Sequence, residues 1–196
     1  MSHEEKPSSP QALDDPYSNI PSEHYVAIGQ AVAVWADFEL TVDRMLWKML
    51  GVPQAVGACV TSQFNSVFAR LQALQSLAHL HRASEDDLKK LGRFKADLSS
   101  FSERRNRIVH DARFRRHTGE VGRLELLARK ELHFGIQTET VESLRQFRDE
   151  IAAKRREFIA LFRSILRKTQ ALRARVSKLF PQLVLSDLDE AGQSSE

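Results

Sequence analysis

The segment 103–111 carries the residues of this chain whose types and spacing best suit chemistry. On a helix, at about 100° per residue, Asn106 and His110 lie one turn apart on the same flank. Arg105 lies about 140° from His110 by the same arithmetic, but its long side chain can bend back toward that flank. A histidine transfers protons near neutral pH, and the fork of an arginine suits phosphate. The three side chains therefore form a candidate site for proton transfer beside an anion.

Arg105 also interrupts the apolar stripe of its predicted helix, so it needs a partner or a polar surrounding. An unpaired buried charge costs several kcal/mol. Either an acid pairs with Arg105, or this side of the helix faces a polar cleft. The candidate acid is Glu39, which occupies the same kind of core position in the stripe of the first predicted helix. That stripe runs through Ile28, Val32, Trp35, position 39, Val42, Leu46 and Met49.

Four long helices are expected to position these side chains. Apolar periodicity and helix-start signals mark residues 21–49, 54–82, 84–112 and 138–179. Only 8 glycines and 6 prolines among 196 residues agree with this assignment. The expected fold class is therefore all-α, an up-and-down four-helix bundle.

Three parts of the chain depart from regular helices. Residues 112–137 contain a turn signal at 117–120, which predicts a short hairpin or an irregular excursion between the third and fourth helices. Residues 1–22 are expected to form a disordered N-terminal arm, and residues 181–196 an acidic C-terminal tail. One helical domain, residues 23–180, remains between them.

The second predicted helix has almost no charge. From Met49 to Leu80 the only charged residue is Arg70, and the helix is expected to break near Gly57 or Thr61. A helix without a charged face is usually covered on more than one side. Two interpretations remain open, a central place in the bundle and a homodimer interface. The lone cysteine, Cys59, is expected to be a small core residue.

Charge is distributed unevenly along the chain. The net charge is +3, and residues 1–20 carry −3 and residues 181–196 carry −4, so residues 21–180 carry +10. A basic body suits a polyanion such as nucleic acid, although a merely solvated surface explains it equally well. The same two interpretations apply to residues 154–178, which hold nine Lys or Arg against one Glu.

The run Arg105-Asn106-Arg107-Ile108-Val109-His110 resembles the R-x4-6-H motif of the HEPN superfamily, the "higher eukaryotes and prokaryotes nucleotide-binding" domains. The polar residue after the arginine and the position late in a long helix are similar to that family. The resemblance covers residues 23–180 by architecture and the six motif residues by identity. Position 112 is Ala, where one toxin branch of the family has Tyr.

The resemblance implies metal-independent RNA cleavage through the 2′-hydroxyl, with no cofactor. Such cleavage needs a base on the 2′-hydroxyl, an acid on the departing 5′-oxygen and positive charge at the phosphorus. His110 suits the proton transfers, Arg105 the phosphate, and Asn106 the orientation of the imidazole or a phosphate oxygen. Glu39 would hold Arg105 in place. The arginines expected to guide the RNA backbone are Arg104, Arg107, Arg113, Arg115 and Arg116.

A single histidine cannot easily act as base and acid on opposite sides of one phosphorus. Members of the family pair two subunits so that two motifs line one cleft, and the resemblance therefore implies a homodimer with a composite site. It also implies a role in a toxin–antitoxin pair or phage defence, with a cognate antitoxin or regulatory protein. The alternative is a non-catalytic helical scaffold that binds nucleic acid or a protein, in which His110 favours the helix dipole and Arg105 pairs with Glu39.

The remaining sequence features exclude other classes. One cysteine rules out a disulfide framework and a cysteine-based zinc site, and His79 and His81 point to opposite sides of a helix, so no metal site is expected. A Gly-rich phosphate loop, a Ser-centred elbow and an HExxH motif are missing. No run of apolar residues reaches the roughly 18 that span a membrane, and the polar start is no signal peptide, so a cytoplasmic protein is expected.

Overall fold

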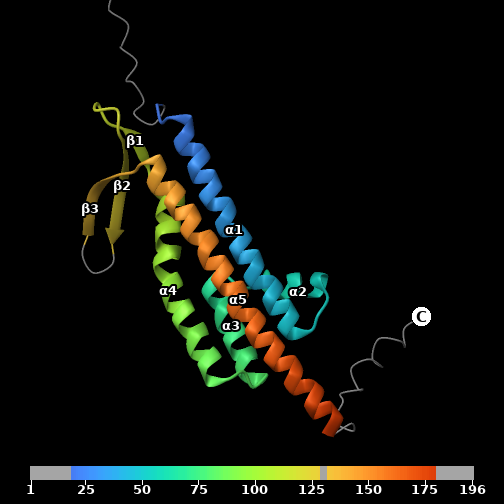
Figure 1. The fold of residues 1–196 in the computed structure, drawn as a ribbon. Helices are drawn as coiled ribbons and strands as arrows, with labels where there is room; N and C mark the ends of the chain where they lie inside the picture. The colour runs from blue at the N-terminus through green and yellow to red at the C-terminus, as the bar shows by residue number, and fades with distance from the viewer. Residues whose placement is uncertain (1–18, 129–131, 180–196) are drawn as a thin grey trace, which may run out of the picture. The chain divides into compact units, whose positions relative to one another are not determined.

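The computed structural model describes residues 19–128 and 132–179. These residues form five helices and three strands (Figure 1). In chain order they are α1 (Ser22–Leu50), α2 (Gln54–Thr61), α3 (Val67–Leu80), α4 (Glu85–His110), β1 (Arg113–Arg115), β2 (Val121–Ala128), β3 (Leu132–Thr138) and α5 (Val141–Leu179). The expectation of a mostly helical chain is confirmed, and so is the break near Thr61, where α2 ends.

The segment between α4 and α5 differs from the short hairpin or irregular excursion expected, because it is a three-stranded antiparallel sheet of order β1-β2-β3. The register places Arg113 opposite Arg123 and Gly122 opposite Thr138. Gly119 has a φ of +88° in the turn between β1 and β2, a backbone conformation that favours glycine. The third strand escaped prediction because alternation in residues 121–134 is incomplete, so the segment also suits a helix.

The chain divides into two compact units. The described residues of the first unit are 19–33, 103–128 and 132–149, and those of the second are 34–102 and 150–179. In the first unit the sheet lies beside the end of α4 and the start of α5 (Figure 1). Its buried apolar side chains come from both helices and the sheet, among them Ile108, Val121 and Phe147.

The second unit is built on buried aromatic rings from three helices. Phe38 of α1 lies 5.9 Å from Phe158 of α5, and Phe94 of α4 lies 5.3 Å from the same ring, centroid to centroid. All three side chains are fully buried. Tilted and edge-on ring pairs of this kind contribute about 0.5–1.5 kcal/mol each beyond the area that they bury. The helical spacing of apolar residues predicts Phe94 and Phe158 in this core, whereas the stripe of the first helix passes through position 39 and misses Phe38.

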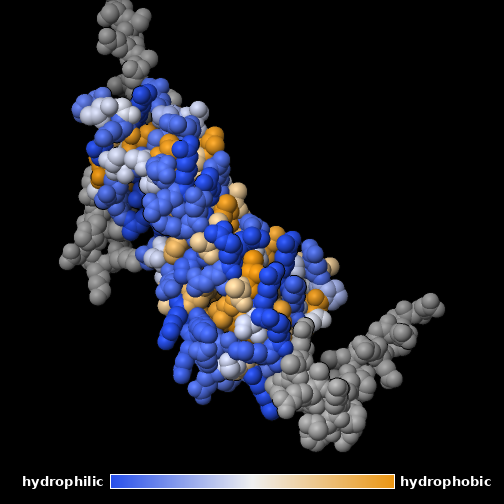
Figure 2. All heavy atoms as spheres, viewed as in Figure 1, coloured by the Kyte–Doolittle hydropathy of each residue, from blue (hydrophilic) through white to orange (hydrophobic). Residues whose placement is uncertain are grey.

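The short helix α2 packs in one place only. Its Gly57 faces the ring of Trp47 so closely that a Cβ atom would collide with it, and the Trp47 Nε1 donates to Thr61 Oγ1 at 3.3 Å. The other faces expose Val56, Val60 and Cys59, and hydrophobic side chains appear at the surface over α2 (Figure 2). The expectation of a core cysteine is therefore wrong, because the side of α2 that carries Cys59 faces outward.

Among residues 19–128 and 132–179, no helix combines the length and the apolar character needed to cross a membrane. The expected arm over residues 1–22 and the acidic tail over residues 181–196 lie outside the described residues, except for positions 19–22.

Candidate functional site

The three motif residues lie on the last two turns of α4, where two of them face solvent. Asn106 and His110 are exposed, and His110 is the final residue of the helix. Arg105 is partly buried, and its Nη1 donates to the Asn106 Oδ1 at 2.9 Å. The guanidinium therefore does bend toward the flank that carries Asn106, as the length of an arginine side chain allows.

The C-terminus of α4, where His110 lies, is capped by Arg113. The Arg113 Nη2 donates to the Ile108 carbonyl at 2.7 Å, and its Nη1 donates to the Asp111 carbonyl at 3.2 Å. The last carbonyls of a helix have no partner within the helix, and a cation there also favours the helix dipole. Arg113 thus fixes the backbone on both sides of His110.

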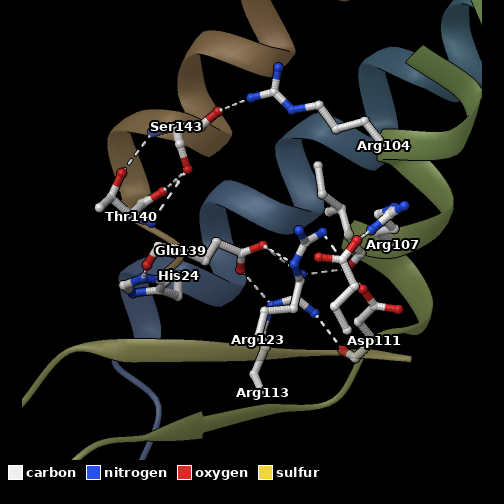
Figure 3. A network of polar contacts seen from close by, with 11 residues as sticks. His24, Arg104, Arg107, Asp111, Arg113, Arg123, Glu139, Thr140 and Ser143 are labelled. Atoms are coloured by element: carbon white, nitrogen blue, oxygen red, sulfur yellow. Dashed lines mark hydrogen bonds and ion pairs between the residues drawn. The ribbon is translucent and has the colours of Figure 1, made fainter. Parts of the chain in front are cut away.

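Arg113 is itself held by Glu139, which lies two residues before the start of α5 (Figure 3). The two side chains form a forked ion pair, with Arg113 Nε 2.6 Å from Glu139 Oε1 and Nη2 3.1 Å from Oε2. Only 10% of the Arg113 side chain and 5% of the Glu139 side chain are exposed. The ring of buried His24, from α1, lies against the Glu139 carbonyl with Nε2 at 3.2 Å. This pair therefore links the end of α4, the sheet and the start of α5.

A second arginine, Arg123 of β2, approaches the same carboxylate more loosely. Its Nε lies 3.9 Å from Glu139 Oε2, and its Nη1 lies 3.7 Å from Asp111 Oδ2. Burial lowers the pKa of the Arg123 guanidinium from its ordinary value, although the charges of Glu139 and Asp111 oppose that effect. The sequence prediction missed Arg123 and Glu139. The sequence offered one signal for this pair: Glu139 is an acid at the start of the last predicted helix, and the segment before it is rich in arginine.

The structure gives each of the five arginines expected at the RNA backbone a partner within the first unit. Arg104 donates from Nη2 to the Ser143 carbonyl at 2.9 Å and lies over the Phe147 ring, 4.6 Å from its centroid. Arg107 forms an ion pair with Glu125, and Arg113 pairs with Glu139 as described. Arg115 of β1 is exposed and donates from Nε to the Gly119 carbonyl at 3.4 Å, and Arg116, in the turn that follows, is partly exposed with its Nη1 3.9 Å from Glu120 Oε2. The RNA-contacting role of all five stays a prediction.

Glu39 belongs to the second unit and Arg105 to the first, so their pairing stays a prediction. Glu39 is partly buried on α1. Its neighbour one turn on is Asp43, whose pKa is raised above 3.8 mainly by burial, with a further rise from the charge of Glu39. Arg70 opposes this rise, with its Nε 3.3 Å from Asp43 Oδ1.

The basic stripe of α5 is partly neutralised within the second unit. Lys154 pairs with Asp97 at 3.4 Å, Arg155 with Asp37 at 3.0 Å, and Lys168 with Asp87 at 2.6 Å. These contacts favour the interpretation of a solvated, ion-paired helix face for this part of the stripe. Arg156, Arg163 and Arg167 are exposed.

A polar cavity of about 270 Å³ lies in the first unit beside α4. Its wall includes Arg104 and Ile108 of α4, Arg123 and Glu125 of β2, and Glu139. Ile108 lies two residues from both Asn106 and His110, which places it about 160° around the helix from each of them. The cavity and the motif flank are therefore on different faces of α4.

Comparisons with protein-family models, with curated proteins and with solved structures find no match to this chain. Within the described residues, no three His, Cys, Asp or Glu side chains gather as a metal-binding group. The functional assignment consequently rests on the motif and on its surroundings.

Proposed function

We propose that this chain is an endoribonuclease of the HEPN type, which cleaves RNA without a metal ion at Arg105, Asn106 and His110. The observation that supports the proposal most is the 2.9 Å hydrogen bond from Arg105 to Asn106, on a helix that ends at an exposed His110. This arrangement gives solvent access to a group that transfers protons, and it places a guanidinium beside the amide of Asn106, which lies one turn before His110.

In the proposed reaction the RNA 2′-hydroxyl attacks the adjacent phosphorus. A base removes the hydroxyl proton, the O2′–P bond forms, the P–O5′ bond breaks, and an acid returns a proton to the 5′-oxygen. The products are a 2′,3′-cyclic phosphate and a 5′-hydroxyl. Arg105 would stabilise the charge that grows on the phosphorane oxygens, and Asn106 would orient the imidazole or a phosphate oxygen.

Since one imidazole cannot easily serve both faces of the phosphorus, the proposal includes a homodimer that brings two motifs to one cleft. It also includes the up-and-down order of a four-helix bundle that the family has. A role in a toxin–antitoxin or phage-defence system, with a cognate antitoxin or regulator, rests on the resemblance alone.

The test is cleavage of single-stranded RNA and transfer RNA in EDTA, with the wild type, His110→Ala and a matched control, His117→Ala. Both histidines are exposed, but His117 lies in the turn between β1 and β2, outside the motif. Circular dichroism checks that all three proteins fold equally. Cutting by the wild type and His117→Ala, with cyclic phosphate ends, and none by His110→Ala is the expected result.

A second experiment tests the composite site. Inactive Arg105→Ala and His110→Ala subunits are mixed, unfolded together and refolded, so that mixed dimers form. Recovery of cleavage in the mixture supports a site built from two subunits, and a mixture as inactive as its parents argues against it.

The alternative function is a non-catalytic scaffold that binds nucleic acid or a protein partner. It is favoured by the intramolecular partners of Arg104, Arg107 and Arg113, because these three arginines are engaged in the fold at positions where the cleavage hypothesis expects contacts to RNA. Under this alternative the wild type and His110→Ala both leave RNA intact, although circular dichroism shows that both are folded.

A further inference from the structure

The cations of α5 in the second unit differ in whether an acid compensates them. Those that contact α1 and α4 pair with acids of these helices. Three others, Arg156, Arg163 and Arg167, are exposed, and none of them forms an ion pair with any residue that the structure describes. Arg167 donates from Nε to the Arg163 carbonyl at 3.4 Å, which leaves its positive charge without a counter-charge.

These three arginines lie in one line along α5, which we call the outer arginine row. At about 100° per residue, Arg163 and Arg167 lie only about 20° to either side of Arg156. The fully buried side chains of Phe158 and Ile165 are on the opposite side of the helix. At about 1.5 Å per residue the row is about 17 Å long. Three guanidinium groups therefore extend into solvent along one side of a straight helix.

The outer arginine row contains no acid. Glu157 follows Arg156 in the chain, but it points about 100° away and pairs with Lys154 at 2.9 Å. The nearest acid along the row, Asp149, lies two turns before Arg156 and pairs with Arg148 at 2.8 Å. Between residues 150 and 168, the other residues within about 60° of the row are uncharged, namely Ala152, Ala153, Ile159 and Ala160. The row thus has three positive charges and no carboxylate among them.

The chemistry of the row favours a nucleic-acid strand over other polyanions. All three cations are arginines, and a guanidinium both binds phosphate through two hydrogen bonds and stacks on bases. Each strand of a duplex carries a phosphate about every 3.4 Å along the axis, so a row of about 17 Å passes several phosphates. An acidic peptide offers no bases to stack on. A helix that binds a membrane surface needs large apolar side chains, whereas the row is flanked mainly by alanine.

We infer that the outer arginine row of α5 binds the backbone of an RNA strand, with one phosphate at each guanidinium. The choice of RNA rests on the proposed function, but the row lies in the second unit, whereas the Arg105–His110 motif lies in the first. The alanines between the arginines leave room for the strand to approach the helix. Binding of this kind does not depend on base sequence and weakens as salt rises, because the strand releases counterions when arginines neutralise its phosphates.

The test measures the affinity of the full chain for a single-stranded 2′-O-methyl oligoribonucleotide, which lacks the free 2′-hydroxyl and stays uncut. The affinity is measured at several salt concentrations, because each phosphate contact adds about 0.7 to the slope of log K against log salt for a single strand. The triple variant Arg156→Gln/Arg163→Gln/Arg167→Gln is expected to reduce this slope by about 2 and to weaken binding at least tenfold at low salt. A wild type that does not bind the probe, or a variant with an unchanged slope, overturns the inference.

The matched control removes three exposed cations from another part of the same unit. Lys89→Gln/Lys90→Gln/Arg93→Gln, on α4, changes the net charge by the same amount, and Lys89 and Lys90 each pair with an acid one turn away. This variant is expected to keep the salt slope and the affinity close to those of the wild type. Circular dichroism checks that both triple variants are folded. Equal losses in the two would mean that net charge alone determines binding, which contradicts a site at the row.

Arg156→Lys/Arg163→Lys/Arg167→Lys tests the choice of ligand. It keeps three positive charges, so the salt slope should stay, but it loses the planar forks, so the affinity for the probe should fall severalfold. An affinity equal to that of the wild type would mean that any polyanion suffices, which overturns the assignment to a nucleic acid. His110→Ala separates the two proposals. It should abolish cleavage while retaining the probe affinity and the salt slope, so failure of catalysis and failure of the row give different results.

Discussion

Glu139→Gln is the substitution that tests most directly how the end of α4 is held in place. The glutamate carboxylate faces Arg113 through two short contacts and Arg123 through one longer contact, and only 5% of its side chain is exposed. Glutamine has nearly the same shape but no charge. The variant therefore leaves two buried guanidinium groups opposite each other across β1 and β2 with no carboxylate between them.

The expected loss follows from burial. Removing one member of a buried ion pair costs about 3–5 kcal/mol, because the other charge stays buried without compensation. The glutamine amide still accepts one hydrogen bond from Arg113, which places the loss near the lower end, at about 3 kcal/mol. For a chain of this size 1 kcal/mol corresponds to about 2–4 °C, so Tm should fall by about 6–12 °C.

Thermal and urea unfolding followed by circular dichroism measure this loss. The control is Glu120→Gln, because Glu120 forms an exposed pair with Arg116 at 3.9 Å. Exposed pairs contribute about 0–1 kcal/mol, so the control should melt close to the wild type. In the double variant Arg113→Gln/Glu139→Gln, the loss should be smaller than the sum of the single losses. A loss below 1 kcal/mol for Glu139→Gln would refute the reasoning.

Two further predictions concern the second unit. Gly57→Ala should lower the free energy of unfolding by about 1–3 kcal/mol, because the new Cβ collides with the Trp47 ring. The control Gly29→Ala, in open space on the part of α1 that belongs to the first unit, should not lower it. Urea unfolding followed by tryptophan fluorescence compares the two variants. The pKa of Asp87 lies below 3.8, because the hydrogen bonds from Lys168 and the Ser84 hydroxyl outweigh its burial. The stability that this carboxylate contributes is therefore present above pH 3.8 and lost as the pH falls through the lower folded-state pKa. Unfolding from pH 6 to pH 2 should show Asp87→Asn losing less stability on acidification than the wild type, and parallel curves would contradict this.

Much of the helical framework follows from local patterns in the sequence. Apolar residues spaced three and four apart predict the buried positions Trp35, Phe94, Leu98 and Phe158, and all of them are buried. Such spacing is a property of one helix and requires no knowledge of its neighbours. The sheet is different, because β1 has only three residues and pairs with a strand that starts beyond a turn. Its existence depends on tertiary contacts that no local pattern carries.

The candidate site likewise has one part that the sequence predicts and another that depends on the fold. Arg105, Asn106 and His110 are recognisable from spacing on one helix, and the bend of Arg105 toward Asn106 follows from side-chain length. The partners of Arg113 could not be predicted, because Glu139 lies 26 residues away and only the sheet register brings the two together. The sequence therefore shows which residues are available for chemistry, whereas the fold determines which arginines are engaged in structure.

The two faces of α4 separate residues that anchor the helix from exposed residues within one short arginine-rich stretch. Arg104 and Ile108 face the sheet and the start of α5, where Arg104 contacts the Ser143 carbonyl and Phe147. Asn106 and His110 face away from that interior and remain exposed. Residues four apart lie on the same side of a helix. The side of α4 that carries Arg104 and Ile108 therefore anchors the helix, while the side that carries Asn106 and His110 stays exposed. The stability of the Glu139 network can therefore change without any direct change at His110, so stability and cleavage are expected to respond to different substitutions.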